Sequence, residues 1–134
     1  MNRQELSAIL RSIKATAHVK LSDALPYIQQ LSTNRIEAIE NASDDYTVRD
    51  LIAFVKMCDK SLYLNQCESV DNIDDLRECL IKECKSFDMS SRQLAKAASV
   101  PFSILTAFEE GRCGLRVDTF LKLANALGLI IEII

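Results

Sequence analysis

Residues 71–134 contain four amphipathic segments separated by helix start and stop signals, and this order constrains the fold more than any other feature. In the first segment an apolar stripe recurs at i, i+4 and i+8 from Leu76 to Cys84, as on one face of a helix. Either Asp71 or Asp74 is expected to cap this helix, because acidic groups favour its N-terminal end. The pattern predicts short helices packed around a core.

Three further helices are expected to follow. Ser90, with Gln93 three residues later, forms a capping-box pattern that starts a short second helix. Pro101 is expected at the first position of a third helix that ends at Glu110, ahead of a glycine. The fourth helix is expected over residues 117–127, where apolar residues again share one face.

The final run, Leu129-Ile-Ile-Glu-Ile-Ile, is rich in β-branched residues and follows Gly128, which predicts a strand rather than more helix. The chain has 134 residues, 49% of them hydrophobic, with only 3 glycines and 2 prolines to interrupt helices. We therefore expect a mainly all-α fold with a short terminal strand.

A resemblance to a known family rests on residues 89–129, MSSRQLAKAASVPFSILTAFEEGRCGLRVDTFLKLANALGL. This stretch resembles the lambda-repressor/Cro-like family of helix-turn-helix regulators, also called xenobiotic-response-element-type. The strand that follows is similar to that of an antitoxin-like subset, in which it pairs with its two-fold mate. The residues that match the family's core and helix end are Leu94, Ala95, Val100, Leu105, Phe108, Glu109 and Gly111.

A second, degenerate copy appears when the chain is compared with itself at an offset of 69, which places Glu40 over Glu109. Leu62 and Leu64 then fall on Ile131 and Ile133, so the first half also ends in a candidate strand. The other matched pairs are Ser22 with Ser91, Leu25 with Leu94, Leu31 with Val100, Ile36 with Leu105, Ala38 with Ala107, Ile39 with Phe108, Val48 with Val117, Leu51 with Phe120, and Ile52 with Leu121.

The repeat predicts two tandem lambda-repressor-like helix-turn-helix domains, residues 1–64 and 71–134, joined by a linker at residues 65–70. If the strands 61–64 and 129–134 pair within one molecule, the chain is a monomeric pseudo-dimer that satisfies both strand edges. If the C-terminal strand pairs between two copies, the protein is a homodimer. The sequence leaves both arrangements open.

In the family, the third helix contacts bases in the major groove of double-stranded DNA and the start of the second contacts phosphate. Carried over by position, the resemblance implies these DNA-binding residues in the C-terminal copy: Ser91 and Arg92 for phosphate; Phe102, Ser103, Thr106 and Ala107 for bases. The matching residues of the N-terminal copy are Ser22 and Asp23 on the second helix, and Thr33, Asn34, Arg35 and Glu37 on the third.

Asn34 and Arg35 are the better candidates for base contacts, because the C-terminal set lacks the side chains that form bidentate bonds to bases. Arg112 and Arg116 flank the turn after the third helix, where the family often contacts phosphate; they could equally neutralise helix ends. Acidic residues nearby would oppose docking on DNA. These are Asp23, Glu37, Asp44 and Asp45.

The net charge of −3 and the pI near 5.2 give no overall cationic field to attract DNA or anionic membranes. The five cysteines lack CxxC spacing, which argues against a disulfide framework and a zinc site, although burial of Cys79 or Cys84 in a core is expected. The single His18 lacks catalytic or ligand-forming neighbours. The start resembles no signal peptide, so we expect a cytoplasmic protein with no enzymatic activity, cofactor, metal or membrane contact.

These observations predict a DNA-binding transcriptional regulator, a repressor or an antitoxin that regulates a small bacterial or phage operon. The alternative is a protein-interaction module that uses the helix-turn-helix fold to bind and inhibit a partner such as a toxin, a polymerase subunit or a nuclease. The acidic charge and the apolar Phe102 and Ile104 favour this alternative.

Overall fold

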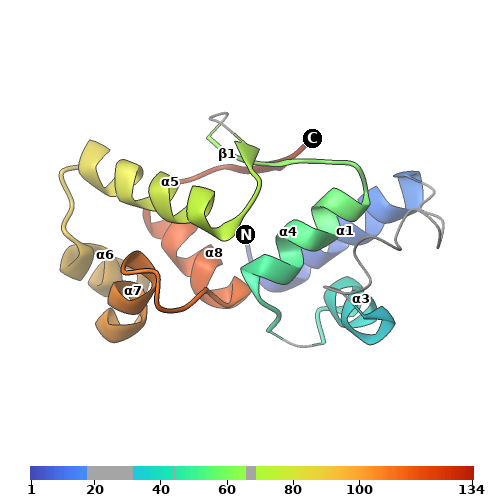
Figure 1. Ribbon diagram of the computed structural model, residues 1–134, viewed down its shortest axis with the longest axis horizontal. Coiled ribbons are helices and arrows are strands. Elements are labelled where there is room, and N and C mark those ends of the chain that lie inside the picture. Colours follow the sequence, from blue (N-terminus) through green and yellow to red (C-terminus); the bar gives the residue numbers. More distant parts are fainter. Residues whose placement is uncertain (18–31, 44, 66–68) are drawn as a thin grey trace.

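The computed structural model describes residues 1–17, 32–43, 45–65 and 69–134 (Figure 1). Within these residues the chain is mainly helical, with seven helices and one small sheet of three antiparallel strands in the order β2-β1-β3. The prediction of a mainly helical fold is confirmed at this level.

The first half of the chain supplies three described helices and one strand. Side chains cap two of these helices: the Ser32 hydroxyl accepts a hydrogen bond from the Arg35 amide, and the Thr47 hydroxyl accepts one from the Asp50 amide. The elements are α1 (Arg3–Ala17), α3 (Thr33–Asn41), α4 (Val48–Met57) and β1 (Leu62–Leu64).

The second half supplies the other elements: β2 (Ser69–Val70), α5 (Ile73–Ser86), α6 (Ser91–Ala98), α7 (Phe102–Glu109), α8 (Val117–Ala126) and β3 (Ile131–Ile133). The capping box of Ser90 and Gln93 at the start of α6 is confirmed. Asn72 caps α5, so the prediction of an aspartate cap was wrong; its side chain accepts a bond from the Asp75 amide. Pro101 is the N-cap of α7 rather than its first helical residue.

The predicted linker also contains a strand. Val70 of β2 pairs with Leu62 of β1 and is buried. The sequence concealed this strand because Val70 is a lone apolar residue at the end of a polar run, too short to show an alternating pattern. The chain between the two halves therefore contributes to the sheet instead of only connecting its ends.

The observed elements recur at the offset that the sequence comparison gave. Adding this offset to both bounds of α4 gives the bounds of α8, and adding it to those of β1 gives those of β3. The first residue of α3 is related to that of α7 in the same way. Ser22, His18, Asp23, Leu25 and Leu31 lie outside the described residues.

The two halves are joined by two antiparallel backbone connections. Strands β1 and β3 pair around Tyr63 and Glu132, which is the pairing within one chain, one of the two arrangements that the sequence left open. At the starts of α4 and α8, the Val48 amide donates to the Leu115 carbonyl (2.9 Å) and the Val117 amide donates to the Tyr46 carbonyl (2.8 Å). Both connections join segments related by the offset, so a local two-fold axis passes through them.

The buried side chains of the two halves form one hydrophobic cluster. It contains fully buried aromatic rings from both halves, Phe54 of α4 and Phe108 and Phe120 of the C-terminal half. In Figure 1 the sheet lies at one side of the molecule, whereas α3 and α7 both lie at the opposite side, one in each half. Among the described helices, none is both long enough and apolar enough to cross a membrane.

The described cysteines differ sharply in exposure. Cys58 and Cys84 are buried, which confirms the core position expected for one of the pair Cys79 and Cys84, whereas Cys113 is exposed. Cys67 lies outside the described residues. Burial raises the pKa of the Cys58 thiol from 9.0 to about 11. Only the thiolate reacts with alkylating agents, so burial should protect Cys58 both sterically and chemically.

We expect iodoacetamide at about pH 8 to modify Cys113 of the folded protein and to leave Cys58 unmodified until urea unfolds the chain. Peptide mass spectrometry measures both reactions in one sample. The folded-state pKa of Cys58 is raised, so burial of the protonated thiol contributes to the free energy of unfolding. This contribution is complete below pH 9.0 and is lost as the pH rises through about 11. Equal alkylation of the two cysteines without urea would contradict the burial of Cys58.

Candidate nucleic-acid interface

Helices α6 and α7 form a compact pair joined by a connection of three residues, 99–101. Ser99 ends α6 in the left-handed conformation (φ 56°), and its amide bonds back to the last turn of the helix. The inward faces of the pair contribute Leu94, Leu105 and Phe108 to the core, where all three are buried. Packing on this side leaves the opposite side of α7 directed toward solvent.

The outward side of α7 is largely apolar. Phe102 and Ile104 keep 37% and 41% of their surface exposed, and Ser103 between them is also exposed. Thr106 differs, because its hydroxyl oxygen is buried and has no hydrogen-bond partner among the described residues. A contact between the Thr106 hydroxyl and a base would therefore require rotation of this side chain.

Arg92 and Phe102 are predicted DNA contacts from different helices, and the structure brings them together. The guanidinium carbon of Arg92 lies 4.5 Å from the centre of the Phe102 ring, in cation–π geometry. Both residues are exposed. The ring contact restrains the guanidinium while its N–H groups can still bind an anion.

Ser91 at the start of α6 already has a partner within the protein. Its hydroxyl donates to the Glu109 carboxylate, with both carboxylate oxygens at 2.8 Å. This bond links the beginning of α6 to the end of α7 and uses the hydroxyl proton. In this arrangement Ser91 can bind phosphate only through its backbone amide at the helix start.

In the N-terminal half, Asn34 and Arg35 occupy the first turn of α3 and are exposed. The Arg35 Nη1 atom lies 3.2 Å from a carboxylate oxygen of Asp50 at the start of α4. The Arg35 side chain remains 61% exposed, whereas that of Asp50 is 12% exposed. Thr33 begins α3.

Arg116 approaches Arg35 from the other half of the chain. Both residues line a small pocket of about 180 Å³ beside the backbone bridge between Thr47 and Arg116. The Arg116 Nη1 atom also donates to the Asp45 carbonyl at 2.7 Å. The fold thus gathers at the local two-fold axis two predicted DNA-binding arginines that lie in different halves of the sequence.

Arg112 forms an ion pair with Glu110, with its Nε atom 2.8 Å from the carboxylate, and both side chains are more than half exposed. Exposed pairs of this kind contribute little to stability, so a phosphate group can replace the carboxylate at small cost. The structure therefore leaves Arg112 accessible for the predicted phosphate contact.

The described acidic residues that were expected to oppose DNA binding differ in how far their charge is compensated. The Asp45 carboxylate accepts a hydrogen bond from the Asp118 amide (3.0 Å) and lies 4.0 Å from Arg3, so its charge is partly compensated within the protein. Glu37 is exposed on α3. Asp23 and Asp44 lie outside the described residues.

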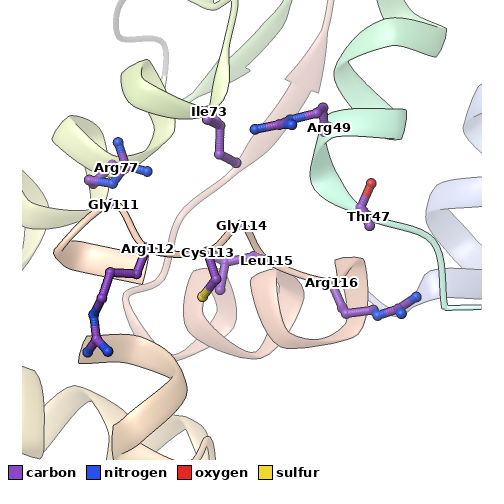
Figure 2. A pocket seen from close by; sticks show the side chains of 10 residues that line it. All are labelled: Thr47, Arg49, Ile73, Arg77, Gly111, Arg112, Cys113, Gly114, Leu115 and Arg116. Atoms are coloured by element: carbon purple, nitrogen blue, oxygen red, sulfur yellow. The ribbon is translucent and has the colours of Figure 1, made fainter. Parts of the chain in front are cut away.

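Two arginines that the sequence analysis did not select also belong to this region. Arg49 and Arg77 line a larger pocket together with Arg112 and Arg116 (Figure 2). The sequence signal for Arg49 was its alignment with Asp118 at the offset of 69, a reversal of charge between the copies. Arg77 carried no such signal, because a lone basic residue on a helix is usually solvated.

The described part of the chain contains no group of three histidine, cysteine or acidic side chains arranged to hold a metal ion. No protein-family model, no curated protein and no solved structure matches this chain.

Proposed function

We propose that the chain is a DNA-binding transcriptional regulator made of two tandem helix-turn-helix domains, with α3 and α7 as its recognition helices. The observation that carries the proposal is the placement of α3 and α7 at the same side of the molecule, opposite the sheet, around a local two-fold axis (Figure 1). A protein that inserts two helices into successive major grooves needs this arrangement.

The proposed mechanism is steric occlusion of a promoter. Residues at the starts of α3 and α7 contact bases, while Arg92, Arg112 and Arg116 contact phosphates on either side of the groove. The two recognition helices differ in sequence, so the half-sites should be unequal and about one helical turn of DNA apart. A repressor or an antitoxin of a small operon fits this mechanism.

Binding to the DNA upstream of the protein's own gene tests the proposal. We expect specific binding whose logarithmic affinity falls with the logarithm of salt concentration, by about 0.9 for each phosphate neutralised. A footprint with two unequal half-sites for one bound chain supports the tandem arrangement. A palindromic footprint bound by one chain contradicts it.

Replacing Arg92 with glutamine is expected to weaken binding to every DNA sequence by a similar factor and to reduce the salt slope by about 0.9, because one phosphate contact is lost. Fluorescence anisotropy at several salt concentrations measures both effects. The matched control is Lys60→Gln, which removes an equal charge from an exposed residue two positions before β1. Strand β1 lies on the opposite side of the molecule from α7 (Figure 1). Equal effects of the two substitutions would show that Arg92 acts only through net charge.

A second candidate function is binding of a partner protein through α7. The observation that favours it is the exposed apolar pair Phe102 and Ile104, which suits a protein groove better than a row of base edges. Absence of DNA binding near physiological salt, together with loss of partner binding in Phe102→Ala, would favour this function over DNA recognition.

A further inference from the structure

The larger pocket beside the joint of the two halves has a volume of about 480 Å³, and its lining within the described residues includes four arginines and no carboxylate. Figure 2 shows that the lining comes from three segments: the start of α4, the start of α5, and the connection between α7 and α8. The four arginines are Arg49, Arg77, Arg112 and Arg116.

Arg77 is held rigidly at one side of this arginine pocket. Its Nε atom donates to the Phe108 carbonyl at 2.7 Å, its Nη1 atom pairs with Asp74, and its guanidinium carbon lies 5.2 Å from the Phe108 ring centre. The side chain is only 17% exposed. A guanidinium fixed in this way loses little conformational entropy when an anion binds.

Arg49 extends from α4 across the opening toward Ile73, as Figure 2 shows. Ile73 and the buried Leu115 give the pocket an apolar wall beside its cationic groups. A pocket of this volume exceeds the needs of a single inorganic ion and lies within the range of sites for small organic ligands. The lining therefore suits a molecule with both an anionic and an apolar part.

On the other side of the joint, the position that corresponds to this pocket at the offset of 69 has charged side chains that already neutralise one another. At the offset of 69, Asp118 takes the place of Arg49, and Asp45 takes the place of Gly114. The Arg3 guanidinium occupies that place, 2.9 Å from the Asp118 carboxylate and 4.0 Å from that of Asp45. One side of the joint thus carries its own counter-charge. In the arginine pocket, Arg77 and Arg112 pair with Asp74 and Glu110, but these carboxylates lie outside the described lining, whose charged groups are all positive.

We propose that the arginine pocket binds a small phosphorylated molecule. Phosphate offers guanidinium groups bidentate, charge-assisted hydrogen bonds, and several arginines around one site match a group with more than one negative charge. The apolar wall accommodates the organic part of the ligand. This proposal goes beyond DNA recognition, because Arg49 and Arg77 bind the ligand whether or not DNA is present.

Calorimetric titration of the full chain with inorganic pyrophosphate, at constant ionic strength and without DNA, tests the proposal. We expect saturable binding with a Kd below about 1 mM. Pyrophosphate should also slow alkylation of Cys113, an exposed thiol in the pocket lining, which locates the bound anion. Absence of saturable binding up to about 10 mM would overturn the proposal.

Arg49→Gln is expected to weaken pyrophosphate binding at least about tenfold, the loss typical of one charge-assisted hydrogen bond. Lys56→Gln is the matched control, because it removes an equal charge from an exposed position on the same helix, outside the pocket. Equal binding by the two variants would overturn the proposal. An Arg49→Lys variant that recovers part of the affinity would support a direct contact.

Duplex DNA is the other source of phosphate for these arginines, and a third measurement separates the two sources. If duplex DNA shields Cys113 from iodoacetamide while pyrophosphate neither binds nor shields it, the pocket serves the DNA backbone and the small-molecule proposal is wrong. If pyrophosphate binds and shields Cys113 but duplex DNA does not bind at all, this proposal stands and the proposed regulatory function fails.

Discussion

Replacing Phe120 with alanine is expected to lower the free energy of unfolding by about 3–5 kcal/mol and to destabilise both halves of the chain together. Phe120 lies on α8 and is fully buried in the shared hydrophobic cluster. The two halves are also joined through β1 and β3 and through the bond between Tyr46 and Val117. A cavity in the C-terminal half should therefore weaken the N-terminal half as well.

The tyrosines make this coupling measurable. All three tyrosines of the chain lie before residue 65 and there is no tryptophan, so tyrosine emission reports on the N-terminal half and on its joint with the C-terminal half, where Tyr46 and Tyr63 lie. We expect the urea midpoint from tyrosine emission to shift together with the midpoint from circular dichroism. Phe87→Ala is the matched control, because Phe87 is 56% exposed. A tyrosine transition that stays in place while the dichroism transition splits would contradict the coupling.

Replacing Arg35 with alanine is expected to weaken specific DNA binding by about 10-fold to 100-fold, because the chain loses a side chain able to form bidentate bonds with guanine. Discrimination between DNA sequences should fall with the affinity. Competition titrations with specific and unrelated duplexes measure both quantities. This prediction rests on the proposed regulatory function.

Asp50→Asn separates a DNA contact from a structural role of the same arginine. It removes the negative charge of Asp50 from the ion pair with Arg35 and leaves the Arg35 side chain unchanged. If Arg35 binds DNA, Asp50→Asn should keep or increase the affinity while Arg35→Ala reduces it. If the ion pair only positions α3 against α4, both substitutions should reduce the affinity alike.

Local signals were sufficient to predict most helices and the terminal strand. The capping box at Ser90 and the apolar stripe from Leu76 to Cys84 act over a few residues, so the sequence reveals them directly. The offset of 69 combined with the need to satisfy strand edges made pairing of β1 with β3 one of two arrangements that the sequence allowed. These features depend on spacing, which a single sequence contains.

Features that depend on distant residues could not be predicted in the same way. The bond from Ser91 to Glu109, the stacking of Arg92 on Phe102, and the arginine pocket all require the relative placement of different helices. Strand β2 escaped prediction because so short a strand carries no periodicity. The candidate site was thus found as separate residues, whereas their partners and environment came from the tertiary structure.

Pairing of β1 with β3 inside one chain changes how the two proposed recognition helices, α3 and α7, can vary. In a symmetric dimer every substitution occurs twice, so both half-sites change together. Here Asn34 can change without any change at Ser103, so each of the two proposed half-sites can be tuned separately. The joined halves also remain together on dilution, because their effective concentration is fixed by the chain rather than by the amount of protein. At low protein concentration, the fractional occupancy of a proposed DNA site should then rise in proportion to the protein concentration. A protein that must dimerise before binding would show a steeper dependence on concentration.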